Sequence, residues 1–234
     1  LRLQMTANAQ LNGDGLVAEF VASRTDGKRG DFDLAATLSR DAGTLDLTLK
    51  LSEQENGIAA TVLAIPNEPS VDLSVVANGP LDDLVFDLQI DTDGSERLAG
   101  EIAVKTTGDA ANPDRRIVAD IGGDITAVIA PEYRDFFGPD VGLKADALLA
   151  ADGSVSVDQL DLQAAAVELQ GQVRLDADKW PAFIDIEGTV ARADGKAVLL
   201  PGGEGDVALD RVTLNIDYDL DAGEAYEAQF DITD

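Results

Sequence analysis

The chain has 234 residues, of which 45 are acidic and 17 basic, so its formal net charge is −28. This length is ample for a substantial core, and an apolar share of 45% is ordinary, so the high charge does not imply disorder. Cysteine and histidine are both absent, which excludes disulfides, thiolate nucleophiles, Ser-His-Asp triads and zinc sites with His or Cys ligands. The acidic balance also argues against binding to nucleic acid, because phosphate recognition depends on Lys and Arg.

Apolar and polar residues alternate along most of the chain. In chain order, the clearest alternating segments are 45–51, 84–90, 155–164, 214–220 and 230–232. Successive side chains of a β-strand point to opposite faces, so each segment would have one apolar and one hydrated face. Such half-exposed strands are typical of antiparallel sheets, and we expect roughly fourteen of them, each about 7–10 residues long.

Turn signals separate these segments at fairly regular intervals. Asp-Gly and Asn-Gly pairs suit the positive φ angles of tight hairpins. They, and related glycine turns, occur at 12–15, 26–27, 41–43, 56–57, 93–94, 152–153, 194–195 and 222–223. One segment differs, since Pro131 suits the first position of a helix and Gly138 suits a helix end. We therefore expect one short helix within 129–138, with Tyr133, Phe136 and Phe137 packed inward.

A looser repeat places a glycine between two apolar residues inside predicted strands. It centres on Gly100, Gly171 and Gly188. A glycine within a strand marks a bend, a bulge or a close approach of two backbones, so three of them favour a sheet that curves, although chance recurrence in a repetitive β-protein is the alternative. We interpret residues 1–234 as a single elongated β-repeat segment of a longer chain, with a possible sub-boundary near 109–115.

No motif indicates catalysis or a cofactor. Carboxylates occur throughout the chain, so no pair stands out as a general acid and base, and we expect neither an enzyme nor a resident cofactor. The acidic runs 91–96 and 217–221 lack the ligand spacing of a calcium loop, so we expect no metal site. The tripeptide Arg29–Asp31 could serve adhesion if a loop displayed it, but a turn between strands also accounts for it.

Several stretches resemble the TamB group of the AsmA-like family, which are envelope proteins of Gram-negative bacteria. These are GPLDDL at 79–84, RLAG at 97–100, PEYRDFFGP at 131–139, ADGSVSVDQLDL at 151–162, VELQG at 167–171, Trp180-Pro181 and IDIEGT at 184–189. The resemblance extends from Val71 to the end, whereas residues 1–70 share only the alternating pattern. The motifs are moderately specific, because repeats of this family are degenerate and carry no catalytic signature.

The resemblance implies a fold, a location and partners. The expected fold class is all-β: an elongated, curled, mostly antiparallel sheet forming a taco-like trough with an aliphatic interior, together with the one short helix. The implied location is the periplasm, as part of a protein anchored in the inner membrane. The implied partners are phospholipid acyl chains and, through other parts of the full-length chain, the outer-membrane barrel protein TamA.

The functional hypothesis is a segment of a hydrophobic conduit that moves phospholipid between the inner and outer membranes and supports outer-membrane protein assembly. Alternate strand positions would line the lipid path. The candidates are Leu47, Leu49, Leu73, Phe86, Leu88, Ile102, Leu160, Leu162, Leu169, Val173, Ile186 and Ile216, whereas Thr48, Asp87, Asp161 and Asp217 would point the other way. The alternative is a structural or adhesive β-repeat of a secreted passenger protein, in which the same aliphatic face would form a closed core.

Overall fold

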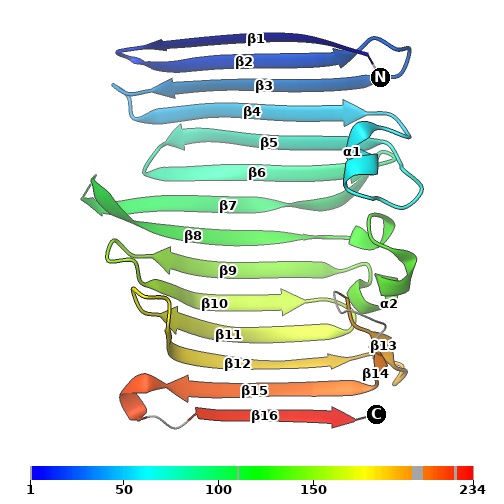
Figure 1. Ribbon diagram of the computed structural model, residues 1–234, viewed down its shortest axis with the longest axis vertical. Coiled ribbons are helices and arrows are strands. Elements are labelled where there is room, and N and C mark those ends of the chain that lie inside the picture. The colour runs from blue at the N-terminus through cyan, green and yellow to red at the C-terminus, as the bar shows by residue number, and fades with distance from the viewer. Residues whose placement is uncertain (1, 110, 202–207, 224–225, 234) are drawn as a thin grey trace. The chain divides into compact units, whose positions relative to one another are not determined.

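The computed structural model describes residues 2–109, 111–201, 208–223 and 226–233. The chain divides into two compact units, Leu1–Lys105 and Thr106–Asp234, and the boundary between them in the sequence lies shortly before the expected sub-boundary near 109–115. In both units antiparallel strands follow one another in chain order (Figure 1). The predicted all-β fold class is thereby confirmed, and we describe each unit separately.

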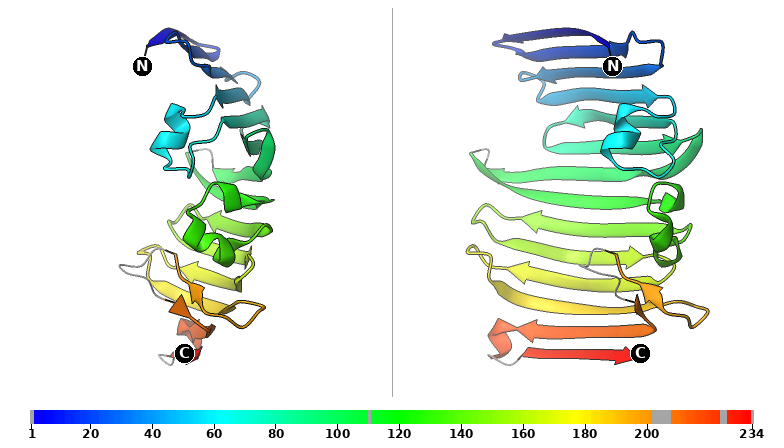
Figure 2. Two further views of the ribbon diagram at one scale, coloured as in Figure 1. Left: turned by 90° about the vertical axis from the view of Figure 1, so that its right-hand side faces the viewer. Right: turned by 45° about the vertical axis from the view of Figure 1, so that its right-hand side comes forward.

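The first unit is a seven-stranded antiparallel sheet whose strand order follows the chain. Its elements are β1 (Leu3–Asn12), β2 (Gly15–Arg24), β3 (Gly30–Ser39), β4 (Thr44–Glu53), α1 (Ile58–Val62), β5 (Val71–Pro80), β6 (Asp83–Thr92) and β7 (Ser95–Asp109), of which β7 runs past the unit boundary. In the left view of Figure 2 its strands follow an arc whose concave side faces α1. The strand order does not return from β7 to β1, so this sheet does not close on itself, which is consistent with a trough.

The second unit is also an open antiparallel sheet, with two short additions. Its main sheet has the order β8 (Asn112–Gly123), β9 (Val141–Leu149), β10 (Val155–Gln163), β11 (Val167–Leu175), β12 (Pro181–Ala191), β15 (Arg211–Asp219) and β16 (Tyr226–Thr233). Between β12 and β15 the chain forms a separate ribbon of β13 (Val198–Leu199) and β14 (Ala208–Leu209). Short 3-10 turns lie at Ile125–Ala127, Pro131–Tyr133 and Leu220–Ala222.

The predicted helix forms in the second unit. A 3-10 turn begins at Pro131 and continues into α2 (Arg134–Phe137), which ends at Gly138 with φ 66°. Phe136 is buried, Phe137 packs edge-on against it with ring centroids 5.0 Å apart, and Tyr133 is half-buried. Pro131 and Gly138 therefore have the roles that the sequence predicted for them.

Two predicted hairpins do not form. Asp194-Gly195 lies between β12 and β13, which pair with β15 and β14 rather than with each other. Asn56-Gly57 lies in the connection from β4 to β5, where α1 follows Gly57, and the Asn56 N–H donates to the carbonyl oxygen of Glu68 at 2.8 Å. Pro66 and Pro69 follow within the same connection, and proline cannot donate to a strand ladder, so no strand continues the alternation there. By contrast, Asp93 and Gly94 have φ angles of 51° and 70°, the geometry of a two-residue hairpin.

Two of the three repeat glycines allow a close approach between strands. A Cβ atom on Gly171 would lie 2.4 Å from the Asp185 carbonyl oxygen, and one on Gly188 would lie 2.9 Å from that of Glu168. Both contacts are made to the neighbouring strand of the β11–β12 pair. Glycine is thus required where these two backbones come together, as the sequence pattern predicted.

Candidate functional site

The first unit has a continuous apolar surface on one face of its sheet, here called the unit 1 apolar face. Pairing brings alternate residues of β2–β7 into rows across the strands. The rows are Ala18, Ala36, Leu47, Ala77, Phe86 and Ile102; Phe20, Leu34, Leu49, Val75, Leu88 and Gly100; and Ala22, Phe32, Leu51, Leu73, Ile90 and Leu98. This face forms because apolar residues occur at every second position of each strand. The register between neighbouring strands then places all of these apolar side chains on the same side of the sheet.

The second unit has an equivalent surface, here called the unit 2 apolar face. Its rows are Ile117, Ala147, Val157, Val173, Ile184 and Tyr218; Ala119, Ala145, Leu160, Gly171, Ile186 and Ile216; and Ile121, Leu143, Leu162, Leu169, Gly188 and Leu214. β10 contains a bulge between Val157 and Leu160, which inserts one extra residue into the alternation. Val157 and Leu160 therefore lie on the same face although they are three residues apart.

All twelve residues predicted to line a path lie on these two faces. Six belong to each unit, and every one of them is half-buried. Thr48, Asp87, Asp161 and Asp217 occupy the positions between them in the strands. The prediction omitted Phe20, Phe32, Leu34 and Ile90, which the same alternation could have identified. It also omitted helix α1, because a helix of five residues is too short to give a periodic signal in the sequence.

Helix α1 covers one end of the unit 1 apolar face. Ile58, Ala59 and Val62 form one wall of a cavity of about 300 Å³, and Phe32 and Leu51 of the sheet lie on its other side. Figure 2 shows α1 on the concave side of this unit. Ala60, Ile65 and Val71 are buried in this region, whereas Leu49 and Leu88 in the middle row of the face are half-buried. Helix α1 thus covers only one end of the unit 1 apolar face.

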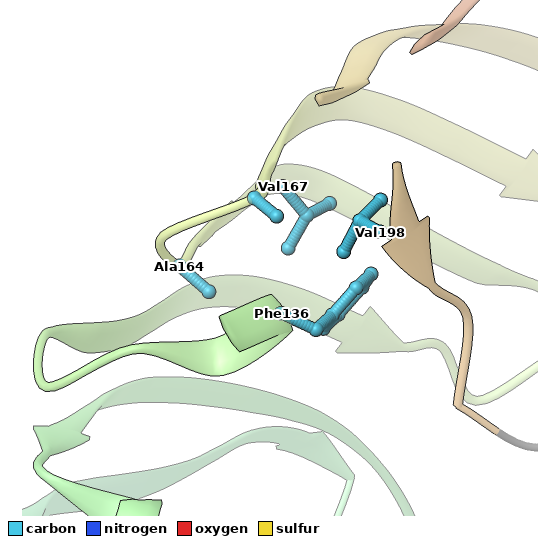
Figure 3. Packing of buried hydrophobic residues seen from close by; sticks show 5 residues of the cluster. Phe136, Ala164, Val167 and Val198 are labelled. Carbon is cyan, nitrogen blue, oxygen red and sulfur yellow. The ribbon is translucent and has the colours of Figure 1, made fainter. Parts of the chain in front are cut away.

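Helix α2 and strand β13 cover part of the unit 2 apolar face. Phe136 of α2 and Val198 of β13 pack with Ala164, Ala166 and Val167 in one buried cluster (Figure 3). Leu162 and Val190 pack against the edge of this cluster. Leu160, Ile186 and Ile216 are not part of this cluster and are half-buried, so the cluster leaves the row across the middle of the sheet uncovered within the described residues.

Two of the charged side chains that line the α1 cavity, Arg24 and Glu53, have hydrogen-bond partners within the first unit. The Arg24 guanidinium donates to both carboxylate oxygens of Asp26, at 3.0 and 2.8 Å, which lowers the pKa of Asp26 and raises that of Arg24. Glu53 is 4% exposed, and its Oε2 accepts a hydrogen bond from the Ala59 N–H of α1 at 2.6 Å. The cavity therefore combines apolar walls with a paired polar margin, an arrangement suited to a hydrocarbon chain rather than to a polar ligand.

A comparable arginine joins two parts of the second unit. The Arg192 guanidinium donates to Asp194 at 2.9 Å and also to Asp135 of α2. The hydrogen bonds from Arg192 lower the pKa of Asp194. This pair of contacts ties the connection after β12 to the helix that covers the apolar face.

The faces opposite the apolar ones are strongly acidic. Asp185, Asp217 and Glu227 are direct cross-strand neighbours in the second unit, and Asp87 pairs with Glu101 in the first. Surface lysines offset only some of this charge, as in Lys105–Asp83 at 3.3 Å and Lys144–Asp120 at 3.3 Å. Each sheet thus separates a hydrated anionic face from an aliphatic one.

The other sequence candidates do not assemble into sites. Within the described residues, no group of three or more Asp or Glu side chains is placed to hold a metal ion. Asp93 belongs to a hairpin turn, and the Asp219 side chain accepts from the Asp221 N–H at the start of a 3-10 turn. Gly30 and Asp31 begin β3, so the Arg29–Asp31 tripeptide is partly within a strand rather than displayed on a loop.

The apolar faces are therefore the candidate functional site in both units. Over the part of the chain that the structure describes, no helix has the length and apolar character needed to span a membrane. Comparisons with protein-family models, with curated proteins and with solved structures found no match to this chain.

Proposed function

We propose that the chain binds lipid acyl chains along its apolar faces, as a segment of a periplasmic conduit. The conduit would move phospholipid between the inner and outer membranes and support outer-membrane protein assembly. It would belong to a longer protein anchored in the inner membrane, other parts of which would engage the barrel partner TamA. The observation that supports acyl-chain binding is the half-exposed aliphatic row across the middle of each sheet. The wider role rests on the family resemblance of the sequence.

The mechanism would be passive. Acyl chains would slide along Leu, Val, Ile and Phe side chains while their headgroups stay in water at the open side. Each buried methylene contributes about 0.8 kcal/mol, so a long aliphatic surface can offset the removal of a two-tailed lipid from a bilayer. Large apolar surfaces that lack a covering layer are usually binding sites, whereas an adhesive or structural repeat would enclose the same residues in a core.

Photo-crosslinking in cells tests which face contacts lipid. A photoreactive residue at Leu88 or Ile186 should capture phospholipid, because both lie in the middle row of an apolar face. The matched controls are Asp87 and Asp185, one position earlier on the opposite face, which should capture none. We prefer Ile186 to Leu162 in the second unit because Leu162 packs against the buried cluster.

An aspartate placed on the apolar face tests function separately from folding. The L88D variant should keep a folded β-sheet spectrum, since water reaches this half-buried position, but it should lose lipid capture because a carboxylate among acyl chains is strongly unfavourable. The control is V85D on the exposed face of the same strand, which should retain both. An unfolded L88D variant together with no lipid capture at any position would instead favour the structural β-repeat.

A further inference from the structure

Helix α1 is anchored to the first unit while one of its sides stands away from the sheet. Ala60 in the helix is fully buried, and Ile65 just after it is 6% exposed, so these two residues fix the position of the segment. Ile58 and Val62, on another side of the helix, line the same cavity as Phe32 of β3, so a space of about 300 Å³ remains between helix and sheet. Figure 2 shows this helix on the concave side of the strands. The cavity thus has walls that are held in place by buried contacts.

The connection that carries α1 concentrates left-handed backbone. Within the described residues, most of the non-glycine residues with positive φ lie in this one connection, namely Asn56, Ala64, Asn67 and Glu68, with φ of 57°, 52°, 63° and 44°. Such conformations are costly for residues with a Cβ atom and persist only where surrounding contacts impose them. Here the Asn56 N–H donates to the Glu68 carbonyl oxygen at 2.8 Å, and the Ile65 N–H donates to that of Ala60 at 2.9 Å. The fold therefore maintains, against local preference, a conformation that keeps α1 above a cavity.

The accessible lining of this cavity is almost entirely apolar. Arg24 and Glu53 border it, but the Arg24 guanidinium donates to Asp26, and Glu53 Oε2 accepts from the Ala59 N–H. Asp31 also borders it, and strand alternation places this residue on the opposite face from Phe32. A buried water molecule needs several polar partners, which this lining does not offer. The cavity is therefore suited to hydrocarbon.

The cavity lies at the end of the unit 1 apolar face. Ala22 of β2 and Leu51 of β4 belong to its sheet-side wall. The next residues of these strands on the same face are Arg24, whose side chain is 8% exposed, and Glu53, which is 4% exposed. Two charged side chains thus end the apolar face at the ends of the strands. The apolar path into the cavity therefore comes from the neighbouring row, which contains Leu49.

The volume of the cavity matches part of one hydrocarbon chain. A methylene group is similar in size to a water molecule, whose share of liquid volume is about 30 Å³, so the cavity holds roughly ten methylene groups. A peptide segment would bring backbone N–H and C=O groups that the apolar lining cannot satisfy. One acyl chain spans half of a bilayer core, about 15 Å, and four residues of a strand span about 14 Å. A chain with its end beside Leu51 would therefore extend past Leu49 to the row of Leu47.

We propose that the α1 cavity holds the methyl end of a single hydrocarbon chain, with the polar head of the same molecule lying towards the Leu47 row. Movement along the face would stop at this cavity, which makes it a holding site rather than part of an open path. The inference rests on the proposed function, because acyl chains must reach the unit 1 apolar face for the cavity to be filled. The chain could be supplied by a phospholipid or by a free fatty acid, and the experiments separate these two sources.

Titration calorimetry of the full chain with saturated fatty acids, from octanoate to hexadecanoate, tests the size of the site. Each methylene that enters the cavity should tighten binding about fourfold, because its burial contributes about 0.8 kcal/mol. The gain per carbon should fall once roughly ten methylene groups are enclosed, since the remaining carbons lie on the half-exposed part of the face. A gain that stays uniform across the whole series would overturn the proposal, because it would indicate binding on the open face alone.

Filling the cavity with a side chain tests its location. Ala22→Phe adds a ring from the sheet side, so it should abolish this binding while the melting midpoint stays at or above that of wild type. The matched control is Ala18→Phe, which lies on the same face of the same strand in the row of Leu47, outside the cavity, and should still bind decanoate. Ala59→Leu fills the cavity from the helix side and replaces Ala22→Phe if that variant does not fold. Undiminished binding in a folded filling variant would overturn the proposal.

Photolabelling tests the orientation and the source of the chain. Palmitic acid with a diazirine at its methyl end should label Ile58, Val62 or Phe32, whereas a diazirine beside the carboxyl group should label residues near Leu47. The same two labels in the acyl chain of phosphatidylethanolamine vesicles identify the source. Labelling by both molecules supports the site and identifies phospholipid as a source, and labelling by palmitic acid alone supports the site for free fatty acid. Equal labelling of the cavity from both ends of the chain would overturn the orientation and with it the proposal.

The failure of this proposal can be distinguished from the failure of the proposed function. Phospholipid capture at Leu88 in cells, with no methyl-end labelling of Ile58, would leave the conduit standing and overturn the holding site. Methyl-end labelling of Ile58 by palmitic acid, with no phospholipid capture at Leu88 or Ile186, would support the holding site and remove the conduit.

Discussion

Glu53 connects a strand of the first unit to the helix that covers its apolar face. Its carboxylate accepts from the Ala59 N–H in the first turn of α1, whereas the N-cap residue Gly57 has no side chain to do so. Because the first N–H groups of a helix lack partners within it, a carboxylate from β4 replaces the missing cap. The buried Glu53 side chain thus links strand β4 directly to the helix that covers the unit 1 apolar face.

We therefore expect the Glu53→Ala variant to be less stable. Loss of the acceptor leaves a helix N–H without a partner, which costs about 1–3 kcal/mol of unfolding free energy, measurable by urea denaturation. Glu55→Ala removes an equal side chain from an exposed position of the same connection and should change stability little. Equal effects of the two substitutions would show that the contact does not anchor α1.

The Arg24–Asp26 pair gives a pH-dependent contribution to stability. Hydrogen bonding from Arg24 lowers the pKa of Asp26 in the folded chain, whereas the unfolded value is about 3.9. The contribution is therefore fully present above the unfolded pKa and is lost as pH falls towards the folded pKa. Asp26→Asn should thus be less stable than wild type at pH 7, and the difference should shrink between about pH 4 and pH 2. Urea unfolding at several pH values measures it, and a constant difference would contradict the assignment.

At the scale of the elements, the β11–β12 pair depends on glycine. The Cβ of an alanine at position 171 would lie 2.4 Å from the Asp185 carbonyl oxygen and 2.9 Å from the Ile186 Cα, closer than backbone atoms tolerate. The pair also belongs to the middle row of the unit 2 apolar face, so the backbone spacing here determines how the aliphatic side chains of both strands line up.

Gly171→Ala should destabilise the second unit by about 1–3 kcal/mol, because the added atom forces the two strands apart. Gly142→Ala is the matched control, since it also lies within a strand and a Cβ there would meet no atom within 4 Å. Thermal unfolding of both variants measures the difference. If the two had equal midpoints, the sheet would be adjusting around position 171 without cost.

At the scale of the whole molecule, charge opposes folding. The chain carries a net charge of −28, and cross-strand neighbours such as Asp185, Asp217 and Glu227 place carboxylates side by side. Like charges directly opposite destabilise a strand pair, and salt screens exposed charges over about 8 Å at 0.15 M ionic strength.

The melting midpoint should accordingly rise between low salt and about 0.15 M salt, as measured by calorimetry. Asp217→Asn removes the middle charge of the acidic row, so it should raise the midpoint at low salt and reduce the further rise on adding salt. A midpoint independent of salt would mean that the acidic groups lie too far apart to repel one another.

The strands and their faces could be predicted because they depend on local information. The period of two places Leu47, Leu49, Phe86 and Leu88 on one side of any sheet in which they pair, whatever surrounds it. The helix at 131–137 was also recognisable, because proline and glycine restrict the backbone on their own. Even the bulge in β10 left a signal, the change of alternation between Val157 and Leu160.

The positions of the covering elements could not be predicted in this way. The fold of residues 54–70 depends on Glu53 and Leu51 of the preceding strand and on Phe32, which lies more than twenty residues earlier, whereas the local pair Asn56-Gly57 alone suggested a hairpin. The burial of Val198 likewise depends on Phe136, more than sixty residues earlier in the chain. Such contacts are selected by packing between elements, and no local pattern encodes their partners.

By itself, the sequence thus determined that the chain forms antiparallel strands with one aliphatic and one acidic face, because side-chain alternation and charge are properties of consecutive residues. Only the tertiary structure decided that, within the described residues, the row across the middle of each aliphatic face stays half-buried and that α1, α2 and β13 cover only part of these faces. Coverage depends on which distant segments meet, and within the described residues the layer over the apolar faces comes from α1 in the first unit and from α2 and β13 in the second.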